Sequence, residues 1–178
     1  MIKLMDILKE IGDATSAVPY THTDSGKSKY ETVEKYEFEV GEDTYVVTMF
    51  VSEVDTTLPS KEGYKKGSTG LQIMFGLKTD KYQGGDTART NKGVQYQVMS
   101  TVTKILKDYI AKHPELVEIS YEPVKKSVDD QAREKLYQIY VQKNLSDWEY
   151  TKDSYGWIYL NKPKPEPSKS IFKRFFNK

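Results

Sequence analysis

The hydrophobic pattern of this chain changes its period near residue 94, and this change restricts the possible folds more than any other feature. Residues 32–51 are rich in alternating, β-branched and aromatic residues around a Gly-Glu-Asp turn, so they predict a β-hairpin. Residues 69–77 predict a third strand. From 94 to 110 apolar residues instead recur every three or four positions, which predicts an amphipathic helix. The chain therefore combines strands with at least one long surface helix.

After that helix, residues 116–121 (LVEISY) predict a short strand. When a helix connects two strands that are neighbours in one sheet, the strands lie parallel, and this applies to 69–77 and 116–121. The earlier strands are joined by loops, which permit antiparallel pairing. We therefore expect an α+β or α/β fold built on a single mixed sheet, with antiparallel first strands, one parallel crossover and helices that cover the sheet.

Weaker patterns complete the expected domain. They predict a helix at residues 2–11, a surface loop that contains His22 at 13–30 and a second helix at 127–144. Residues 148–160 predict a final strand pair or one bent strand. The helix at 127 begins with a Ser-x-x-Asp capping pattern. A chain of 178 residues has the size of one ordinary domain. We assign residues 1–160 to a single globular α/β domain.

This succession of elements resembles the core of the acetyltransferase-like fold, in which antiparallel strands precede the cofactor-binding helix and a strand and a helix follow it. Enzymes of that fold hold the pyrophosphate of acyl-coenzyme A on a glycine-containing loop at the start of the long helix. Lys92, Gly93 and Val94 stand at that place, with a single glycine and a spacing that differs by one residue. The resemblance makes acetyl-coenzyme A the alternative to our expectation of no cofactor, because a shared fold does not by itself carry a function.

Two residues in the helix at 127–144 become candidates under the same resemblance. Tyr137 stands at the Leu-Tyr step where such enzymes often place the tyrosine that protonates the departing thiolate. We favour the competing interpretation, an inward tyrosine that packs and ties its hydroxyl to the backbone. Arg133 lies four residues earlier on the same predicted face, where it could bind a phosphate or carboxylate. A salt bridge across the sheet is the favoured interpretation of Arg133.

The chain contains no cysteine and two histidines, which excludes several kinds of chemistry. Without cysteine there are no thiolate metal sites, disulfides or cysteine nucleophiles, and the wide sequence separation of His22 and His113 leads us to expect no metal site. A chain that cannot form disulfides is typical of the reducing cytoplasm. No apolar run reaches the roughly 20 residues of a membrane span, and charges interrupt the first ten residues, so we expect neither a span nor a signal peptide.

The net charge of +1 is divided unevenly along the chain. Residues 162–178 hold six of the 27 basic residues and one of the 26 acidic residues, which gives this part +5 and leaves −4 for the rest. Residues 161–170 (NKPKPEPSKS) carry three of the seven prolines and predict an extended spacer. An acidic body does not suit nucleic-acid binding, so we interpret the 14 tyrosines and two tryptophans as core and sheet surface.

The short basic aromatic segment at 171–178 is the strongest local signal. Large apolar side chains after an extended polar spacer are exposed, which favours docking to a partner. The stretch KSIFKRFF resembles the sliding-clamp-binding box, with a lysine in place of the usual glutamine and a phenylalanine in place of the usual aliphatic residue. The residues that we assign to partner binding are Lys169, Ile171, Phe172, Lys173, Arg174, Phe175 and Phe176. Self-docking and weak anchoring on an anionic membrane remain as rival interpretations.

Several segments together resemble a group of uncharacterised tailed-phage proteins. They are LMDILKEIG, Val-Pro-Tyr at 18–20, YEFEV with DTYVVTMF, VMSTVTKILKDYI at 98–110, VEISYE and AREKLY. The resemblance covers nearly the whole chain and implies a viral protein that acts in an infected bacterium. It implies no reaction.

From these observations we expect a non-enzymatic phage accessory protein in the cytoplasm of the infected host. It would bind a host or phage protein through its C-terminal segment, with a replication clamp as the candidate partner. Two alternatives stay open. One is an N-acyltransferase that uses acyl-coenzyme A, and the other is a component of the virion.

Overall fold

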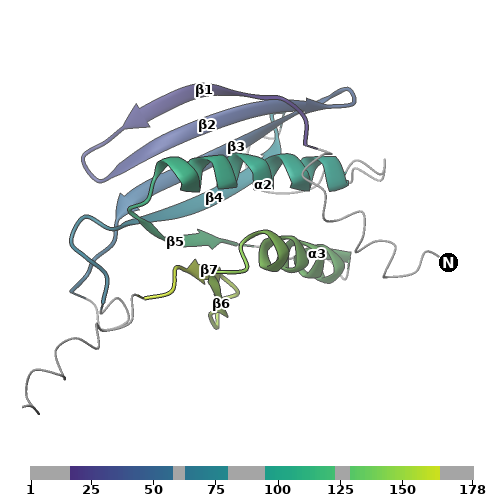
Figure 1. Cartoon of the computed structure of the whole chain (residues 1–178). Coiled ribbons are helices and arrows are strands. Elements are labelled where there is room, and N and C mark those ends of the chain that lie inside the picture. The colour runs from purple at the N-terminus through teal and green to yellow at the C-terminus, as the bar shows by residue number, and fades with distance from the viewer. Residues whose placement is uncertain (1–16, 58–62, 80–94, 123–128, 165–178) are drawn as a thin grey trace, which may run out of the picture.

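The computed structural model describes residues 17–57, 63–79, 95–122 and 129–164. These residues form seven strands in one sheet and two helices (Figure 1). The strands are β1 (Tyr20–Lys27), β2 (Glu31–Val40), β3 (Asp43–Glu53), β4 (Thr69–Leu77), β5 (Leu116–Tyr121), β6 (Glu149–Lys152) and β7 (Ile158–Asn161), and the helices are α2 (Gln95–Lys112) and α3 (Asp129–Asn144).

The sheet is mixed, as the sequence predicts. Its strand order is β1-β2-β3-β4-β5-β7-β6, and β4 and β5 form its parallel pair while the other neighbours pair antiparallel. The hairpin β2–β3 turns at Gly41, whose φ of 67° lies in the left-handed region that glycine adopts without strain. Helix α2 connects β4 to β5, which is the predicted crossover.

Strand β1 corrects the prediction of a surface loop at 13–30. Residues 20–27 pair along almost the whole of β2, with a register shift between His22 and Asp24. The segment escaped prediction because an edge strand needs no alternating apolar pattern when its outer residues face water, and here nearly all of it is exposed. Tyr20 and His22 supply the inward contacts through ring packing on Tyr36. The helix predicted at 2–11 lies outside the described residues.

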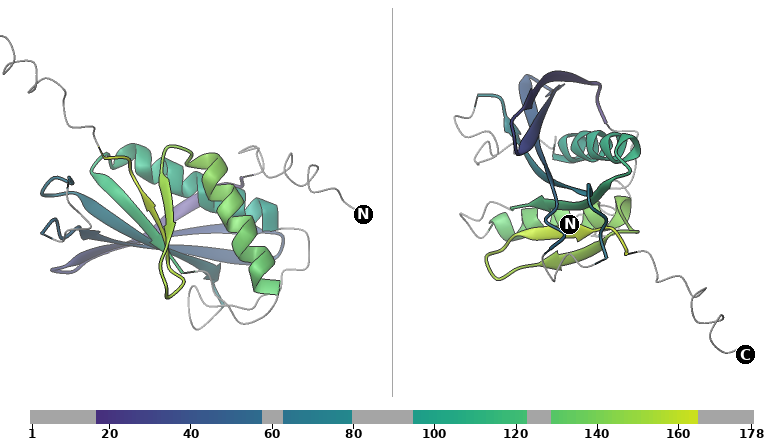
Figure 2. Two further views of the ribbon diagram at one scale, coloured as in Figure 1. Left: turned by 90° about the horizontal axis from the view of Figure 1, so that it is seen from below. Right: turned by 90° about the vertical axis from the view of Figure 1, so that its left-hand side faces the viewer.

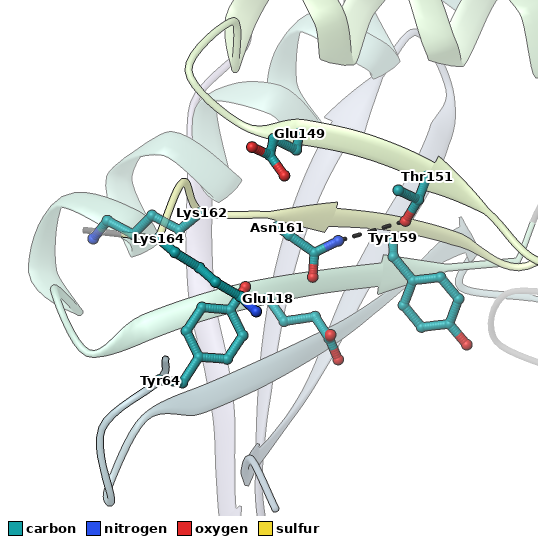
Figure 3. Close-up of a pocket in the computed structure, with 8 residues that line it drawn as sticks. All are labelled: Tyr64, Glu118, Glu149, Thr151, Tyr159, Asn161, Lys162 and Lys164. Atoms are coloured by element: carbon teal, nitrogen blue, oxygen red, sulfur yellow. Dashed lines mark hydrogen bonds between the residues drawn. The ribbon is translucent and has the colours of Figure 1, made fainter. Parts of the chain in front are cut away.

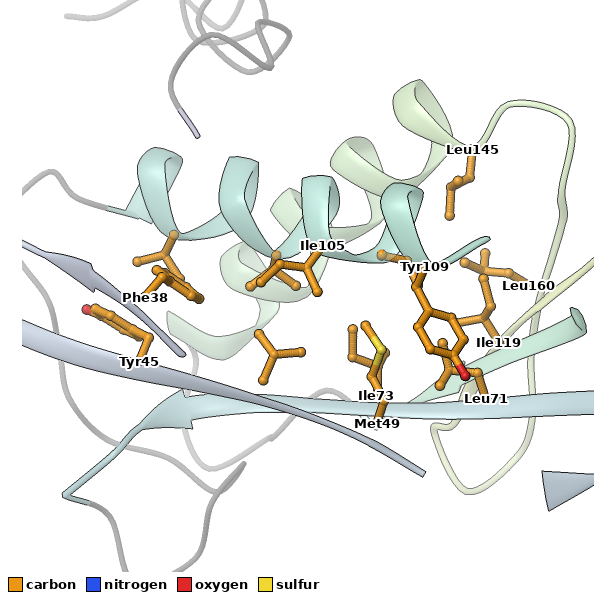
Figure 4. Close-up of a cluster of buried hydrophobic side chains, with 14 of the residues drawn as sticks. Phe38, Tyr45, Met49, Leu71, Ile73, Ile105, Tyr109, Ile119, Leu145 and Leu160 are labelled. Atoms are coloured by element: carbon orange, nitrogen blue, oxygen red, sulfur yellow. The ribbon is translucent and has the colours of Figure 1, made fainter. Parts of the chain in front are cut away.

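The hydrophobic core lies on one face of the sheet, beneath the two helices (Figure 2). Cross-strand partners place their side chains on this face in continuous rows. Helix α2 covers them with the apolar stripe that its sequence predicts, including Ile105 and Tyr109 (Figure 4). The strand residues of this core include Phe38, Tyr45, Val47, Met49, Leu71, Ile73, Ile119 and Leu160.

Helix α3 packs against α2 on the same side of the sheet. Tyr140 is buried, lies within 3.3 Å of the hydroxyl of Ser100 and donates a hydrogen bond to the carbonyl oxygen of Tyr96. Burial raises the pKa of the Tyr140 hydroxyl, so this group stays protonated as a donor. Neither α2 nor α3 is long and apolar enough to cross a membrane.

Tyr20 fastens the edge strand β1 to helix α2. Its hydroxyl donates to Asp108 Oδ2 at 2.6 Å, and Lys104 Nζ donates to the same oxygen at 2.8 Å. Burial, followed by the hydrogen bond to Asp108, raises the pKa of Tyr20 to about 12. The hydrogen bonds from Lys104 and Tyr20 lower the pKa of Asp108. The protonated tyrosine is therefore favoured in the folded state.

Stability is expected to fall as the pH rises from about 10 to 12. A tyrosine whose pKa is raised on folding contributes its stabilisation below the unfolded value near 10 and loses it towards the folded value near 12. We expect Tyr20 to account for about 1 kcal/mol of this loss, after allowance for its partial exposure. Urea unfolding of the wild type and of Tyr20→Phe at pH 9 and near pH 11.5 measures the difference.

The Tyr20→Phe variant should lose less stability between these pH values than the wild type does. Tyr109, whose pKa burial also raises to about 12, keeps part of the dependence in both proteins. Tyr155→Phe serves as the control because Tyr155 is 87% exposed. An equal pH dependence in wild type and Tyr20→Phe would contradict the role given to the Tyr20–Asp108 contact.

Candidate functional site

An open pocket of about 570 Å³ lies on the part of the sheet that the C-terminal strands β5, β6 and β7 form (Figure 3). It is formed by β5, β7, β6, the residues just after β7 and the end of the loop between β3 and β4. Its lining residues are Tyr64, Glu118, Glu149, Thr151, Tyr159, Asn161, Lys162 and Lys164. The volume is in the range of small-ligand sites. The pocket is thus the candidate site among the described residues.

A row of three polar residues crosses the pocket. Strand register pairs Glu118 of β5 with Asn161 of β7, and pairs Asn161 with Glu149 of β6. Side chains directly opposite one another point to the same face of a sheet, so all three project to one side. The neighbouring residues Ile119 and Leu160 are in the core on the other side. The pocket therefore lies on the sheet face opposite the core, α2 and α3.

Asn161 separates the two carboxylates. Its Nδ2 lies 3.5 Å from Thr151 Oγ1, which directs the amide oxygen toward the pocket as an acceptor (Figure 3). Glu118 Oε1 leans in the other direction and lies 3.8 Å from the place that a Cβ would take at Gly70. The neutral side chain of Asn161 on β7 therefore lies between Glu118 on β5 and Glu149 on β6.

Tyr64 and Lys164 meet at one rim of the pocket. Lys164 Nζ lies 5.5 Å from the centre of the Tyr64 ring, a cation–π arrangement. The aliphatic part of Lys164 crosses Gly63, where an added Cβ would come within 3.2 Å of Lys164 Cδ. Gly63 also has a φ of 95°, a backbone conformation that favours glycine.

Two glutamates and two lysines line the pocket, so its formal charges balance. Burial raises the pKa of Tyr64, and the nearby negative charge of Glu149 adds to the rise. Lys162 directs its charge away, since its Nζ donates to the carbonyl oxygen of Pro114 at 3.2 Å. Tyr159 lies within 3.3 Å of Asp153 Oδ2, and burial together with Asp153 raises its pKa. The tyrosine hydroxyls therefore remain neutral at ordinary pH.

Tyr137 lies at a different place, between α3 and strand β4. It is half-buried, and its ring packs against Phe75 with the centroids 5.6 Å apart in an edge-to-face arrangement. It also packs against the small buried cluster of Met99 and Tyr140. Such contacts are those of a packing tyrosine. Tyr137 and the pocket are on opposite faces of the sheet.

The other residues named from the sequence are placed in part. Arg133 is in α3, one turn before Tyr137, and its side chain lies outside the described residues. The cofactor candidates Lys92, Gly93 and Val94 precede the first described residue of α2 and also lie outside. The docking residues Lys169, Ile171, Phe172, Lys173, Arg174, Phe175 and Phe176 follow the last described residue.

The two histidines form separate contacts with carboxylates. His22 Nε2 lies 2.5 Å from Glu34 Oε2 on the neighbouring strand, and His113 Nδ1 lies 2.9 Å from Glu115 Oε1 after the end of α2. Within the described ranges no three histidine, aspartate or glutamate residues gather in a group that could hold a metal ion. Each histidine thus has a carboxylate partner, Glu34 for His22 and Glu115 for His113.

No sequence motif marks the pocket, because its residues are scattered over four segments. One weak signal was present. In LVEISY the polar residues Glu118 and Ser120 alternate with apolar ones, which marks a strand with one polar face. Only the register across β5, β7 and β6 brings Glu118 into line with Glu149, which is 31 positions later in the printed sequence.

Comparisons with models of protein families, with curated proteins and with solved structures find no match to this chain.

Proposed function

We propose that the chain is a non-enzymatic accessory protein that binds a protein partner through its docking segment 171–178, which follows the spacer 161–170. The observation that carries the proposal is the sequence of this segment, in which a proline-spaced polar stretch is followed by SIFKRFFNK. An extended spacer presents large apolar side chains away from the body that precedes it, and such groups favour contact with another protein.

The surroundings of Lys164 support this proposal. After β7, the backbone N–H of Lys162 still bonds to the carbonyl oxygen of Val117, and two residues later Lys164 is exposed. The chain therefore reaches the surface at Lys164, before the proposed docking segment.

For the partner we propose a replication clamp of the infected bacterium or of the phage, with the protein acting in the host cytoplasm. The resemblance of KSIFKRFF to the clamp-binding box supports this choice, and the resemblance of several short segments, spread over nearly the whole chain, to tailed-phage proteins supports the setting. In such a box the aromatic residues of one short helical turn enter an apolar groove. Phe172, Phe175 and Phe176 are the residues that would do so here.

Removal of residues 165–178 is expected to abolish capture of purified sliding clamp while the body stays folded, because Lys164 and everything before it are kept. Biolayer interferometry with immobilised clamp measures the binding. The triple substitution of Phe172, Phe175 and Phe176 by alanine should behave like the truncation. The double variant Ser168→Ala and Ser170→Ala, which leaves charge and aromatics unchanged, is the matched control.

Clamp capture by the truncated chain at full affinity would refute the docking role of this segment. A synthetic peptide of residues 165–178 should compete with the full chain for the clamp. Detection of the chain in purified phage particles by mass spectrometry would instead favour the third alternative, a virion component.

A second candidate function, N-acyl transfer from acyl-coenzyme A, is favoured by the parallel strand pair. Strands β4 and β5 pair only at residues 69–72 and 116–120, after which β4 continues to Leu77 without β5 while it stays paired with β3. Ligands of open α/β sheets bind outside the carboxyl ends of strands where the strand arrangement changes. Tyr137 packs on Phe75 at this end of β4. The order of elements supports the acetyltransferase-like topology as part of this proposal.

Under this second candidate, the backbone around Lys92, Gly93 and Val94 would hold the pyrophosphate, Arg133 would contribute positive charge, and Tyr137 would donate a proton to the leaving thiolate. A thermal-shift titration with acetyl-coenzyme A tests it, because a ligand that binds only the folded state raises the midpoint by mass action. We expect no shift at millimolar concentration. A saturable rise that Gly93→Val removes would establish the cofactor site and favour the enzyme.

A further inference from the structure

We propose that Lys164 is a positioning residue, which fixes the base of the spacer 161–170 to the body and so presents the docking segment 171–178 from a defined point. This role rests on the docking function proposed for that segment. It adds the residue that determines where the partner lies. The observations that carry it are the contacts that Lys162 and Lys164 make after the last strand, β7, has ended.

Lys162 is the first fixed point beyond β7. Its backbone N–H donates to the carbonyl oxygen of Val117 at 2.8 Å, and its Nζ donates to the carbonyl oxygen of Pro114 at 3.2 Å. Both acceptors belong to the stretch of chain around the start of β5. Residue 162 is therefore held beside β5 by its backbone and by its side chain, although the pairing of β7 with β5 ends at Asn161.

Lys164 is the second fixed point. Its Nζ lies 5.5 Å from the centre of the Tyr64 ring, and its Cδ lies 3.2 Å from the place that a Cβ would take at Gly63 (Figure 3). The stem of the lysine thus crosses the loop backbone where Gly63 has no side chain, and its ammonium group lies over an aromatic face. The contact joins the spacer to the loop between β3 and β4.

The sequence restricts the backbone at both fixed points. Lys162 and Lys164 each precede a proline, Pro163 and Pro165, and a residue before proline is confined mainly to extended conformations. Pro163 also has a fixed φ, so Lys164 approaches the Tyr64 ring with few alternatives. Because little conformational freedom is lost when the contact forms, one exposed cation–π contact is enough to favour the anchored state.

Anchoring at Lys164 shortens the tether between the body and the docking segment. Six residues, 165–170, then separate the two. An extended proline-rich chain spans about 3.1 Å per residue, so these residues reach about 19 Å, whereas the nine residues 162–170 would reach about 28 Å if the chain were free from the end of β7. The partner is therefore held within about 19 Å of Lys164, near the loop that carries Tyr64.

Double electron–electron resonance on the full chain measures this anchoring. The chain contains no cysteine, so Ser52→Cys, at an exposed position of β3, and Ser168→Cys, in the spacer, place two nitroxide labels without other changes. We expect a narrow distance component from the anchored chain and a broad one from the released chain. Lys164→Gln should lower the ratio of anchored to released chain about two- to fivefold, the range of one exposed cation–π contact.

Three further variants identify the contact that anchors the spacer. Lys164→Arg keeps a cation for the ring and should retain the narrow component. Lys66→Gln removes the same charge from an exposed lysine of the same loop and should change nothing. Tyr64→Leu removes the ring and should behave like Lys164→Gln. Equal distributions in wild type and Lys164→Gln would overturn the proposal, and so would a narrow component that persists in Tyr64→Leu.

The measurement needs no clamp, so it separates the role of Lys164 from that of the docking segment. Anchoring by Lys164 together with clamp capture by the truncated chain would mean that only the docking role is wrong. Loss of capture on truncation, together with equal distributions in wild type and Lys164→Gln, would mean that the segment docks from a free tether and that Lys164 has no positioning role.

Discussion

Replacement of Ile119 by alanine is expected to lower the free energy of unfolding by about 3 kcal/mol, which includes the cost of the cavity that remains. Ile119 is fully buried in β5 and has a core residue beside it on each neighbouring strand, Leu71 on β4 and Leu160 on β7. It therefore joins the long antiparallel strands to the short C-terminal ones. Urea unfolding followed by circular dichroism measures the change.

Two control variants separate burial from side-chain size. Ile119→Val removes one methylene group and should cost about 1 kcal/mol. Tyr155→Ala removes many more atoms from a side chain that is 87% exposed, so it should change stability by less than about 0.5 kcal/mol. A loss below about 1 kcal/mol in Ile119→Ala would mean that β5 does not connect the two parts of the sheet as described.

The sequence predicts the elements that have a distinctive apolar period or residue composition. Helix α2 buries one face, so its apolar residues recur with the period of a helix, whereas β3 is buried on both faces at residues 45–49 and is recognised by its β-branched and aromatic residues. The parallel pairing of β4 with β5 follows from the helix between them. Strand β1 gave no such signal, because its hydrogen bonds to β2 hold it in place while its side chains are mostly exposed.

The candidate pocket could not be predicted for a related reason. Its chemistry depends on the alignment of Glu118, Asn161 and Glu149 across three strands, and that register is set by the apolar residues between them, such as Leu160 opposite Ile119. The strand order β5-β7-β6 could not be predicted from the sequence either, because β7 lies between β5 and β6 although β6 comes before β7 in the chain. Hydrophobic patterns predict where strands occur, but they do not predict which strands are neighbours in the sheet.

Asp153 holds the turn between β6 and β7, and its replacement by alanine is expected to cost about 2 kcal/mol of stability. Asp153 Oδ1 accepts hydrogen bonds from the backbone N–H groups of Tyr155 and Trp157, each at 2.9 Å. The backbone N–H of Gly156, which has a φ of 99°, donates to the carbonyl oxygen of Asp153. A carboxylate that satisfies several donors contributes more than one neutral hydrogen bond, and its loss leaves the donors without an acceptor.

The same turn also positions the candidate pocket, so this variant has a second expected effect. The β6–β7 pairing places Glu149 beside Asn161, and Asp153 closes the hairpin that fixes this register. Asp153→Ala should therefore also shift the backbone amide NMR signals of Glu149 and Asn161, although Asp153 is not among the pocket residues, whereas the exposed neighbour Ser154→Ala should leave both stability and these signals unchanged. Asp153→Asn keeps one acceptor oxygen and should fall between them. Urea unfolding and NMR spectra of the three variants decide the matter: if Asp153→Ala is as stable as Ser154→Ala, the turn is held by its backbone alone.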